Sequence, residues 1–415
     1  MAQNNNLTTL NGMFKETYAD KIEKLIPDGV KLLNAVKFLG KEKQNGNLYH
    51  QPVVLGLEHG VTFASSGDAF SLNDAVAGTM KDAQVQGSQM VLRSVLSYTA
   101  ASRAMAPGPQ AFESSTKYLV GNMLRSMARK LEIELLYGQV GYGKAASQSG
   151  AVVTITTAEW APGIWAGAEG MSVEFIADDN SASLCVAPIS SVDMDARTIT
   201  LGTAVSGSHG AIQTEISSPG TVSIYHKGAF GNEFAGLHKI LSNTGTLFNI
   251  SAATYNLWKG VEYSAASAQL SISKILSAVA RGVEKGLDQD VKCYVNPRTW
   301  ANLVSAETAR RQYDGSYKPG SMENGASSLK FHGQNGNIEV EPSIYIKEGY
   351  AYILVLEDLV RVGSSDITFK RPGQGDEFFR DLESSAGYEL RAYTDQALFC
   401  SAPGKMILIK DIVNS

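Results

Sequence analysis

The feature that most constrains this chain is a long amphipathic helix, which the sequence predicts from Phe112 to Gly138. Within FESSTKYLVGNMLRSMARKLEIELLYG, apolar residues recur at spacings of three and four and so share one helical face. These residues are Leu119, Val120, Met123, Leu124, Met127, Leu131 and Leu135. Ser114 and Ser115 are suitable N-caps, and Gly138 stands where a left-handed C-terminal cap belongs. At 1.5 Å per residue the helix would be about 36 Å long, and its apolar residues form a packing stripe rather than a ligand site.

The end of this helix contains most of a nucleotide-binding loop. In LLYGQVGYGKAAS, Gly138 precedes Gly143 and Lys144 at the motif's spacing, but Ala145 stands where Ser or Thr would hold magnesium. The motif also follows a strand and opens a helix, whereas here the helix comes first and strand-like residues follow. The sequence therefore predicts no nucleotide binding. We expect Gly141 and Gly143 to give the chain room to turn from the helix into a β region.

The residues before the helix divide into an arm and a long strand pair. Residues 1–44 carry short apolar groups among lysines, and Pro27 and Gly29 interrupt any helix there. NGNLYHQPVVLGLEHGVTF at 45–63 and QVQGSQMVLRSVLSYTAASRAM at 84–105 are rich in β-branched and aromatic residues. They predict two strands joined by a connection of about 20 residues, a length typical of functional or mobile segments. Because few large apolar residues lie at its centre, this hairpin must lie against another surface.

The residues after the helix begin with a β-rich stretch. From 150 to about 228, short strands separated by turn residues predict a small antiparallel barrel or sandwich inserted into the chain. Residues 151–235 carry two basic and nine acidic residues, a net charge of −7, against −5 for the whole chain. We expect this module to face solvent and to point away from nucleic acid, since an acidic surface repels phosphates. An ordinary soluble β domain with acidic loops has the same charge pattern.

Composition and length place the chain among folded proteins of two or three domains. It has 415 residues, of which 44% are hydrophobic and 19% are charged. The start MAQNNNLTTL lacks a basic region followed by an apolar run, so we expect no secretory signal. No run reaches the 18 or so apolar residues that a membrane span needs. Cys185, Cys293 and Cys400 are far apart and odd in number, which predicts a reducing compartment and no disulfide framework.

No pattern in the sequence predicts a catalytic, cofactor or metal site. No two of the six histidines have the i, i+4 spacing of a zinc protease, and no G-x-S-x-G nucleophile elbow occurs. Asp193 with Asp195, and Glu339 with Glu341, place carboxylates two residues apart on predicted strands. Such pairs can hydrolyse glycosides, but a solvated strand face is the expected interpretation. We therefore expect no enzyme activity, no cofactor and no metal.

The order of these segments resembles the major capsid protein of tailed double-stranded DNA bacteriophages, the Hong Kong 97-type fold. The stretches that carry the resemblance are SYTAASRAM, MARKLEIELLYG, GAFGNEFAGLHKIL, VNPRTWANL and YTDQALFCSAPGKMILIKDI. It covers nearly the whole chain and depends on the serial arrangement rather than on one motif. The resemblance implies an α+β fold with an extended loop, a long spine helix, peripheral and axial domains, and an inserted small antiparallel β domain.

The resemblance also implies how the chain divides. The implied segments are an N-terminal arm (1–44), an extended loop (45–110), a peripheral domain with the spine helix (111–149), the inserted β domain (150–232), a mostly axial domain (233–330), and peripheral strands with an axial return (331–415). The extended loop would lie across a neighbouring subunit. The inserted domain would lie on the outer surface.

The function implied by the resemblance is structural. The chain would self-assemble into pentamers and hexamers of an icosahedral phage head that encloses double-stranded DNA, and it would be located in the virion capsid after assembly in the host cytoplasm. Its partners would be other copies of the chain, a separate scaffolding protein or none, portal and cement proteins, and no membrane. Scattered basic residues such as Arg125, Arg129 and Lys130 would make at most weak, non-specific contacts with packaged DNA.

The strand that precedes the helix supplies our candidates for contacts between subunits. They are Met90, Leu92, Leu96 and Tyr98 as a packing face, with Arg93 and Arg103 as partners for acids on a neighbour. The same residues could instead pack within their own subunit, because the pleat of a strand fixes sides but not partners. Lys81 lies in the extended loop, but nothing around it in the sequence predicts an activated, crosslinking lysine.

Two other functions are compatible with parts of the pattern. An encapsulin shares this fold and encloses cargo enzymes, although encapsulins are usually shorter and lack the β insertion. A virion-associated hydrolase would use the paired acids.

Overall fold

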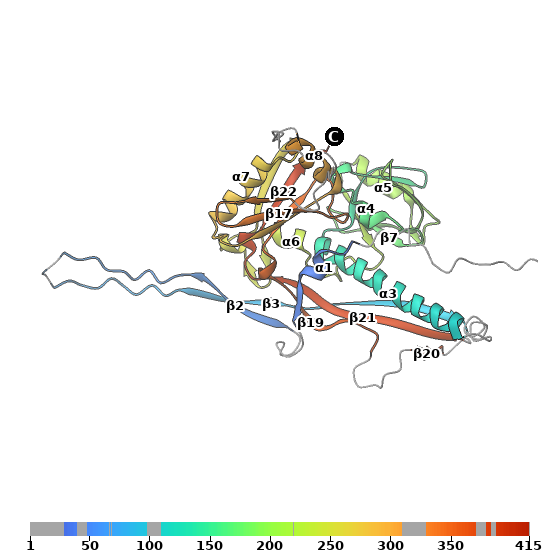
Figure 1. Cartoon of the computed structure of the whole chain (residues 1–415), viewed down its shortest axis with the longest axis horizontal. Helices are drawn as coiled ribbons and strands as arrows, with labels where there is room; N and C mark the ends of the chain where they lie inside the picture. Colours follow the sequence, from blue (N-terminus) through green and yellow to red (C-terminus); the bar gives the residue numbers. More distant parts are fainter. Residues whose placement is uncertain are drawn as a thin grey trace, which may run out of the picture.

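Three sheets and one long hairpin organise the chain around a single long helix (Figure 1). The computed structural model describes residues 29–39, 48–65, 67, 69–97, 109–218, 220–308, 329–370, 379–382 and 387–414. In that part of the chain no helix is both long and apolar enough to cross a membrane. The mixture of helices and sheets confirms the predicted α+β class.

Helix α3 (Pro109–Tyr137) confirms the long helix that the spacing predicts. Its two methionines, Met123 and Met127, are buried in a small cluster with Leu390 and Ala392. Further along, Leu131 and its neighbours reach the main core. The apolar stripe thus packs against two different surfaces, because the helix is longer than either.

The predicted role of Gly138 as a left-handed cap is wrong. Gln139 (φ 65°) and Gly141 (φ 94°) take the left-handed conformation at the end of α3. Gly138 is required for space, since a Cβ at this position would overlap the carbonyl oxygen of Phe234. The chain that returns from the β insertion passes directly against the helix end here, and only glycine allows that approach.

The helix lies on a five-stranded sheet. Its strands are β1 (Lys37–Leu39), β19 (Leu359–Thr368), β21 (Gly387–Cys400), β20 (Phe379–Asp381) and β4 (Ser88–Ser97). Strand β21 is the centre, because β19, β20 and β4 all pair with it antiparallel. Strand β1 joins β19 in parallel and attaches the arm to the sheet.

A six-stranded sheet forms the other part of the body. In order its strands are β14 (Val261–Ala268), β22 (Ile407–Ile412), β18 (Ala351–Leu354), β15 (Val291–Val295), β17 (Asn337–Pro342) and β16 (Leu329–His332). Helix α7 (Ile272–Val283) packs on it, and α8 (Pro297–Thr308) follows β15. Strand β15 pairs with β17 and β18, so strands from both sides of the expected boundary at residue 331 belong to this sheet, and the division into domains stays a prediction.

The residues after α3 form a closed antiparallel barrel. Its strands are β5 (Gly143–Ser149), β6 (Val152–Ile155), β9 (Thr198–Leu201), β8 (Ser183–Asp193), β7 (Ser172–Ala177) and β11 (Val222–His226). Pairing of β8 with β9 and of β11 with β5 completes the ring. The short β10 (Ser206–Gly207) adds to β8, and α5 (His209–Ser217), capped by Ser208, packs on β5 and β8. The barrel was expected over residues 150–232, and its strands span residues 143–226.

The predicted hairpin has its expected first strand but a different second strand. Strand β2 (Tyr49–Gly56) pairs with β3 (Thr79–Val85), and residues 57–78 connect them. The sequence pattern predicts residues 84–105 as the second strand of this hairpin. Instead, Gln86 and Gly87 separate β3 from β4, and β4 pairs with β21 over ten residues. Residues 84–105 were wrongly assigned to the hairpin because β21, the partner of β4, lies some 300 residues away in the sequence. Local patterns carry no information about such pairing.

Short elements complete the body. They are α1 (Leu32–Ala35), η3 (Thr157–Glu159), α4 (Pro162–Trp165), α6 (Leu237–Leu241), β12 (Thr246–Leu247), β13 (Ile250–Ser251), η4 (Asn256–Trp258), η5 (Leu356–Asp358) and η6 (Pro403–Lys405). One continuous cluster of buried apolar side chains runs through the barrel, the six-stranded sheet and the end of α3. The barrel therefore shares its core with the body instead of standing apart as a separate module.

Candidate assembly surface

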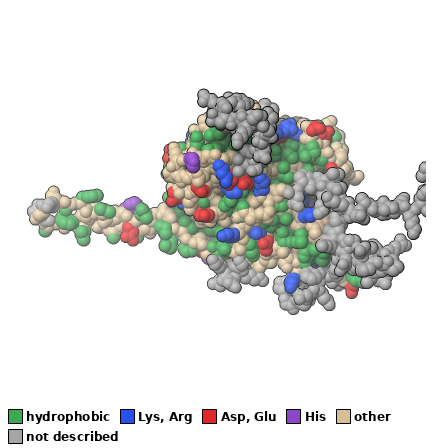
Figure 2. Space-filling view, in the orientation of Figure 1, with side chains coloured by type: hydrophobic (Ala, Val, Ile, Leu, Met, Phe, Trp, Pro, Cys, Tyr) green, Lys and Arg blue, Asp and Glu red, His purple; other side chains and the backbone are tan. Residues whose placement is uncertain are grey.

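The projecting hairpin carries exposed apolar side chains along its length (Figure 2). Eight of the seventeen exposed large apolar side chains in the described residues lie between Val54 and Met80. Among them Phe63 is 92% exposed, Leu72 80% and Leu57 73%. A two-stranded ribbon alone is at best marginally stable in water, and apolar patches of this kind mark interaction sites. The hairpin therefore requires a surface that its own subunit does not provide within the described residues.

The root of the hairpin is held firmly in the body. Tyr49, Ala83 and Val85 are buried, and the Tyr49 ring lies 5.5 Å from the ring of Phe399. The Gln84 amide donates to the carbonyl oxygen of Phe248 at 3.1 Å. The hairpin is thus anchored at one end and uncovered along the rest of its length.

The structure places the predicted apolar contact residues that it describes on the inner side of β4. Met90 and Leu92 are half-buried and pack against the cluster of Met123 and Met127 under α3. Leu96 is also half-buried, which fits the same alternation. Tyr98 and Arg103 lie outside the described residues. The contacts seen for Met90 and Leu92 are within their own subunit, and their role between subunits stays a prediction.

The opposite side of β4 is exposed and carries the predicted contact residue Arg93, together with Val91 and Val95, which the sequence did not single out. Val91 and Val95 are 52% and 50% exposed, and Arg93 lies between them. Arg93 pairs with the buried Glu389 of β21 at 3.1 Å, and Arg391 also contacts Glu389. Burial alternates along β4, so the period of two could have shown both faces, but sequence alone does not say which face the helix covers.

The paired acids are engaged in ordinary structural contacts. Asp193 ends β8 and accepts the backbone amides of Asp195 and Ala196, which closes a turn. Lys292 lies 3.6 Å from Glu339 and 3.0 Å from Glu341, so these carboxylates form ion pairs on the strand face. In the parts of the chain that the structure describes, no three His, Cys, Asp or Glu side chains gather as a metal-binding group.

Lys144, the lysine of the incomplete nucleotide motif, lies in strand β5. Its ammonium group is 3.3 Å from the carboxylate of Asp178, a contact between neighbouring parts of the barrel. Gly141 and Gly143 were expected to give the chain room to turn; Gly141 takes a left-handed conformation after the helix, and Gly143 is already part of β5. A strand follows the glycines, so the helix N-terminus that cradles phosphate in a nucleotide loop is missing from this segment.

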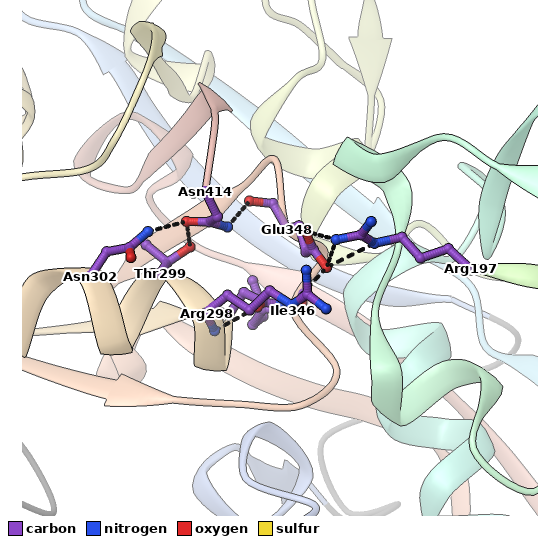
Figure 3. Close-up of polar contacts among 8 residues, drawn as sticks. Arg197, Arg298, Thr299, Asn302, Ile346, Glu348 and Asn414 are labelled. Carbon is purple, nitrogen blue, oxygen red and sulfur yellow. Dashed lines mark hydrogen bonds and ion pairs between the residues drawn. The ribbon is translucent and has the colours of Figure 1, made fainter. Parts of the chain in front are cut away.

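One buried carboxylate ties the barrel to the six-stranded sheet (Figure 3). Glu348 accepts hydrogen bonds from Arg197 of the barrel at 3.1 and 3.2 Å and lies 3.5 Å from Arg298 of α8. Its backbone carbonyl accepts from the side-chain amide of Asn414, which itself accepts from Thr299. The barrel, helix α8 and the end of the chain thus meet at one side chain.

A second buried ion pair fixes the end of α3 against the barrel and the six-stranded sheet. Lys347 donates to Glu159 at 2.6 Å and to the carbonyl oxygen of Gly141 at 3.1 Å, and its ammonium group lies 4.3 Å from the centre of the Tyr137 ring. Burial acts to raise the pKa of Glu159, but the Lys347 ammonium outweighs it and holds the pKa at about 2. Tyr350 also donates to Glu159, so the pair is fully satisfied where it is buried.

Comparison with solved structures identifies the fold. The capsid asymmetric unit of Cyanophage A-1(L) matches with a TM-score of 0.58 at 12% identity, over 98% of this chain and 99% of that one. The capsids of the empty and native GTA particles match with TM-scores of 0.52 and 0.51, each at 9% identity over 99% of both chains. The chain therefore has the Hong Kong 97-type capsid fold, as its segment order predicts. The sequence matches no protein-family model and no curated protein sequence.

Proposed function

We propose that this chain is the structural major capsid protein of a tailed double-stranded DNA bacteriophage. The observation that carries the proposal is the hairpin, which is anchored at its root and bears a row of uncovered apolar side chains from Val54 to Met80. In a closed shell every subunit has another copy of the same chain as its neighbour, so a second copy is the partner for the hairpin. The fold shared with capsid chains over almost the whole length supports this proposal.

In this proposal the hairpin of one subunit lies across the body of its neighbour. The outer face of β4 and β21 suits it as a receiving surface, because the apolar Val91 and Val95 flank the basic Arg93. The hairpin is acidic towards its tip, where Glu58 and Asp74 are exposed. Apolar contact would supply affinity and opposite charge would supply orientation.

The assembled product would be an icosahedral head of pentamers and hexamers in the virion, formed in the host cytoplasm around double-stranded DNA. Portal and cement proteins, and a separate scaffolding protein if one is used, would complete it, and no membrane would be involved. The acidic barrel would lie on the outer surface, and DNA contacts would be non-specific. The role would be structural and not enzymatic, since the paired acids already form turns and ion pairs.

Light scattering and negative-stain microscopy of the purified protein test the proposal. We expect wild-type chain to form capsomers or shells, and a double variant with Leu57→Ser and Leu72→Ser to remain folded but unassembled. Leu257→Ser is the matched control, because Leu257 is an exposed leucine on η4, away from the hairpin. Equal assembly of all three proteins, or a wild-type chain that stays monomeric, would refute the proposal. Nucleic acid rather than enzyme cargo inside native particles would separate a phage head from an encapsulin shell.

A further inference from the structure

The outer face of the five-stranded sheet carries a cluster of three arginines. Arg93 of β4 lies directly opposite Arg391 of β21, and Arg380 of β20 lies directly opposite Glu389 of β21. These residues alternate with the ones that pack under α3, so they lie on the other side of the sheet. Arginines from three neighbouring strands thus share one face.

A single carboxylate lies among these arginines. Glu389 is only 4% exposed, pairs with Arg93 at 3.1 Å and also accepts a hydrogen bond from Arg391. Arg380 instead donates to the hydroxyl of Tyr393, and its guanidinium carbon lies 5.6 Å from the centre of that ring. Three positive groups therefore share one negative group, and the arginine cluster has a net charge of +2.

Arg93 is the member of the cluster that lies between exposed apolar side chains. Its own side chain is 58% exposed, although one end of it pairs with Glu389. Val91 stands two residues before it and Val95 two residues after it, and each is about half exposed. Because residues two apart in a strand share a side, β4 presents an apolar, a basic and an apolar side chain in one row.

The hairpin carries the same row with the opposite charge. Leu72, Asp74 and Val76 stand at the same two-residue spacing, and all three are exposed. The side chain of Asn73 donates to the carbonyl oxygen of Val61 at 2.9 Å, which keeps this segment beside the other side of the hairpin (Figure 1). The hairpin thus presents an apolar, an acidic and an apolar side chain in sequence.

Asp74 is the best placed of the described acids on the hairpin. Asp82 lies 2.7 Å from the imidazole of His50 within the hairpin itself. Glu58 is exposed, but glycines stand two positions before and after it, where Asp74 has large apolar side chains. Only Asp74 therefore combines a negative charge with an apolar row that matches the row on β4.

We propose that Asp74 of one subunit binds the arginine cluster of a second copy through Arg93, and that this pair fixes the register of the hairpin on β4. Strands that pack face to face lie about 10 Å apart, and the side chains of both faces fill that space. Because the two rows have equal spacing, their apolar side chains can meet while the opposite charges pair. A shift by one residue would bring the charges to opposite sides. The inference rests on the proposed function and names the residues that orient the hairpin.

Crosslinking between two variants, each with one added cysteine, tests whether the two residues meet. Asp74→Cys and Arg93→Cys subunits are mixed at high concentration and treated with a short bismaleimide reagent. We expect covalent dimers, against a low background because the three native cysteines are buried. Each variant alone, and a mixture of Glu58→Cys with Arg93→Cys, are the matched controls and should give far fewer dimers.

Charge reversal measures how much the pair contributes. Asp74→Arg should raise the protein concentration needed for assembly by about tenfold or more, because like charges would then face each other. Glu58→Arg makes the same charge change on the same hairpin and should assemble like wild type. Adding Arg93→Glu to Asp74→Arg should recover part of the assembly. Arg93→Gln is the milder variant should that double variant not fold, and its assembly should be weaker and less sensitive to salt than that of wild type.

The outcomes separate this inference from the proposed function. Normal assembly of Asp74→Arg, or an equal loss in Glu58→Arg, would overturn the pair and leave the capsid proposal intact. If the wild-type chain forms no particles, the capsid proposal fails, and dimers or no dimers in the crosslinking mixture still decide the pair. DNA binding that is lost in Arg93→Gln but unchanged in Asp74→Arg would assign the arginine cluster to phosphates and overturn the pair.

Discussion

The hairpin and the barrel both extend from the body, but the barrel pairs its strand edges whereas the hairpin leaves them open. The barrel closes its ring of strands, buries a core continuous with that of the body and is tied down through Glu348. The hairpin leaves two open edges and a row of exposed apolar side chains. Closing the ring leaves no unpaired strand edge for another chain to bind. An open ribbon with exposed apolar side chains can bind another chain through its edges and its apolar face. We therefore expect the barrel side of the molecule to contribute subunit stability and the hairpin to carry association.

Breaking the ion pair beside the barrel should have the largest effect on stability. Lys347→Met leaves Glu159 buried without its counter-charge, which we expect to lower the free energy of unfolding by about 3–5 kcal/mol. Urea titration of the unassembled protein measures this change. The double variant with Glu159→Gln as well should recover part of the loss, and equal stability of single variant and wild type would contradict the assignment.

Acid should weaken the same region without the help of a mutation. The pKa of Glu159 is lowered to about 2, so its stabilisation is complete above its usual value near 4.5 and is lost as pH falls from there towards 2. The expected loss is on the order of 3 kcal/mol, and thermal unfolding at a series of pH values checks it. In the Glu159→Gln variant this part of the acid dependence should be missing.

The link between barrel and α8 should be of intermediate strength. Arg197→Met removes the two-pronged contact with Glu348 but leaves Arg298 nearby, so we expect a loss of about 2 kcal/mol. Arg298→Met removes a longer contact from a half-exposed side chain and should cost less than about 1 kcal/mol. Chemical denaturation measures the free energy of unfolding of both variants. A larger loss for Arg298→Met than for Arg197→Met would show that Glu348 stabilises α8 more than the barrel.

The lysine of the nucleotide-like segment should matter least. Lys144→Ala removes a partly exposed pair with Asp178, for which we expect about 0–1 kcal/mol. Isothermal titration with ATP should show no binding by the wild-type chain. ATP affinity that disappears in Lys144→Ala would contradict our interpretation of this segment.

The sequence predicted what depends on local patterns. The spacing of apolar residues located α3 to within a few residues, and turn residues between short strands indicated the antiparallel barrel. The resemblance, which depends on segment order, indicated the fold that the solved capsid structures share. The helix and the short strands depend on residues close together in the chain, and the resemblance depends on the order of such segments.

The rest depends on partners far apart in the chain. The pairing of β4 with β21, the overlap that makes Gly138 necessary, and the ion pair of Lys347 with Glu159 join residues separated by about 100 to 300 positions. A lysine and a glutamate in isolation are expected at the surface, so no pattern marked this pair as buried. For the same reason the sequence does not say which face of β4 lies under α3, where Met90 and Leu92 pack, and a role for these residues between subunits stays a prediction.

Trimming the hairpin tests the central claim most directly. Replacing residues 57–78 with Asn-Gly joins Gly56 to Thr79, which already face each other in the ribbon, through a two-residue turn. The particle mass of the trimmed and wild-type proteins is then measured by light scattering under the same conditions. We predict a stable trimmed subunit with an unfolding transition like that of wild type and no shells. Shells of wild-type mass from the trimmed protein would contradict the claim that the hairpin carries association.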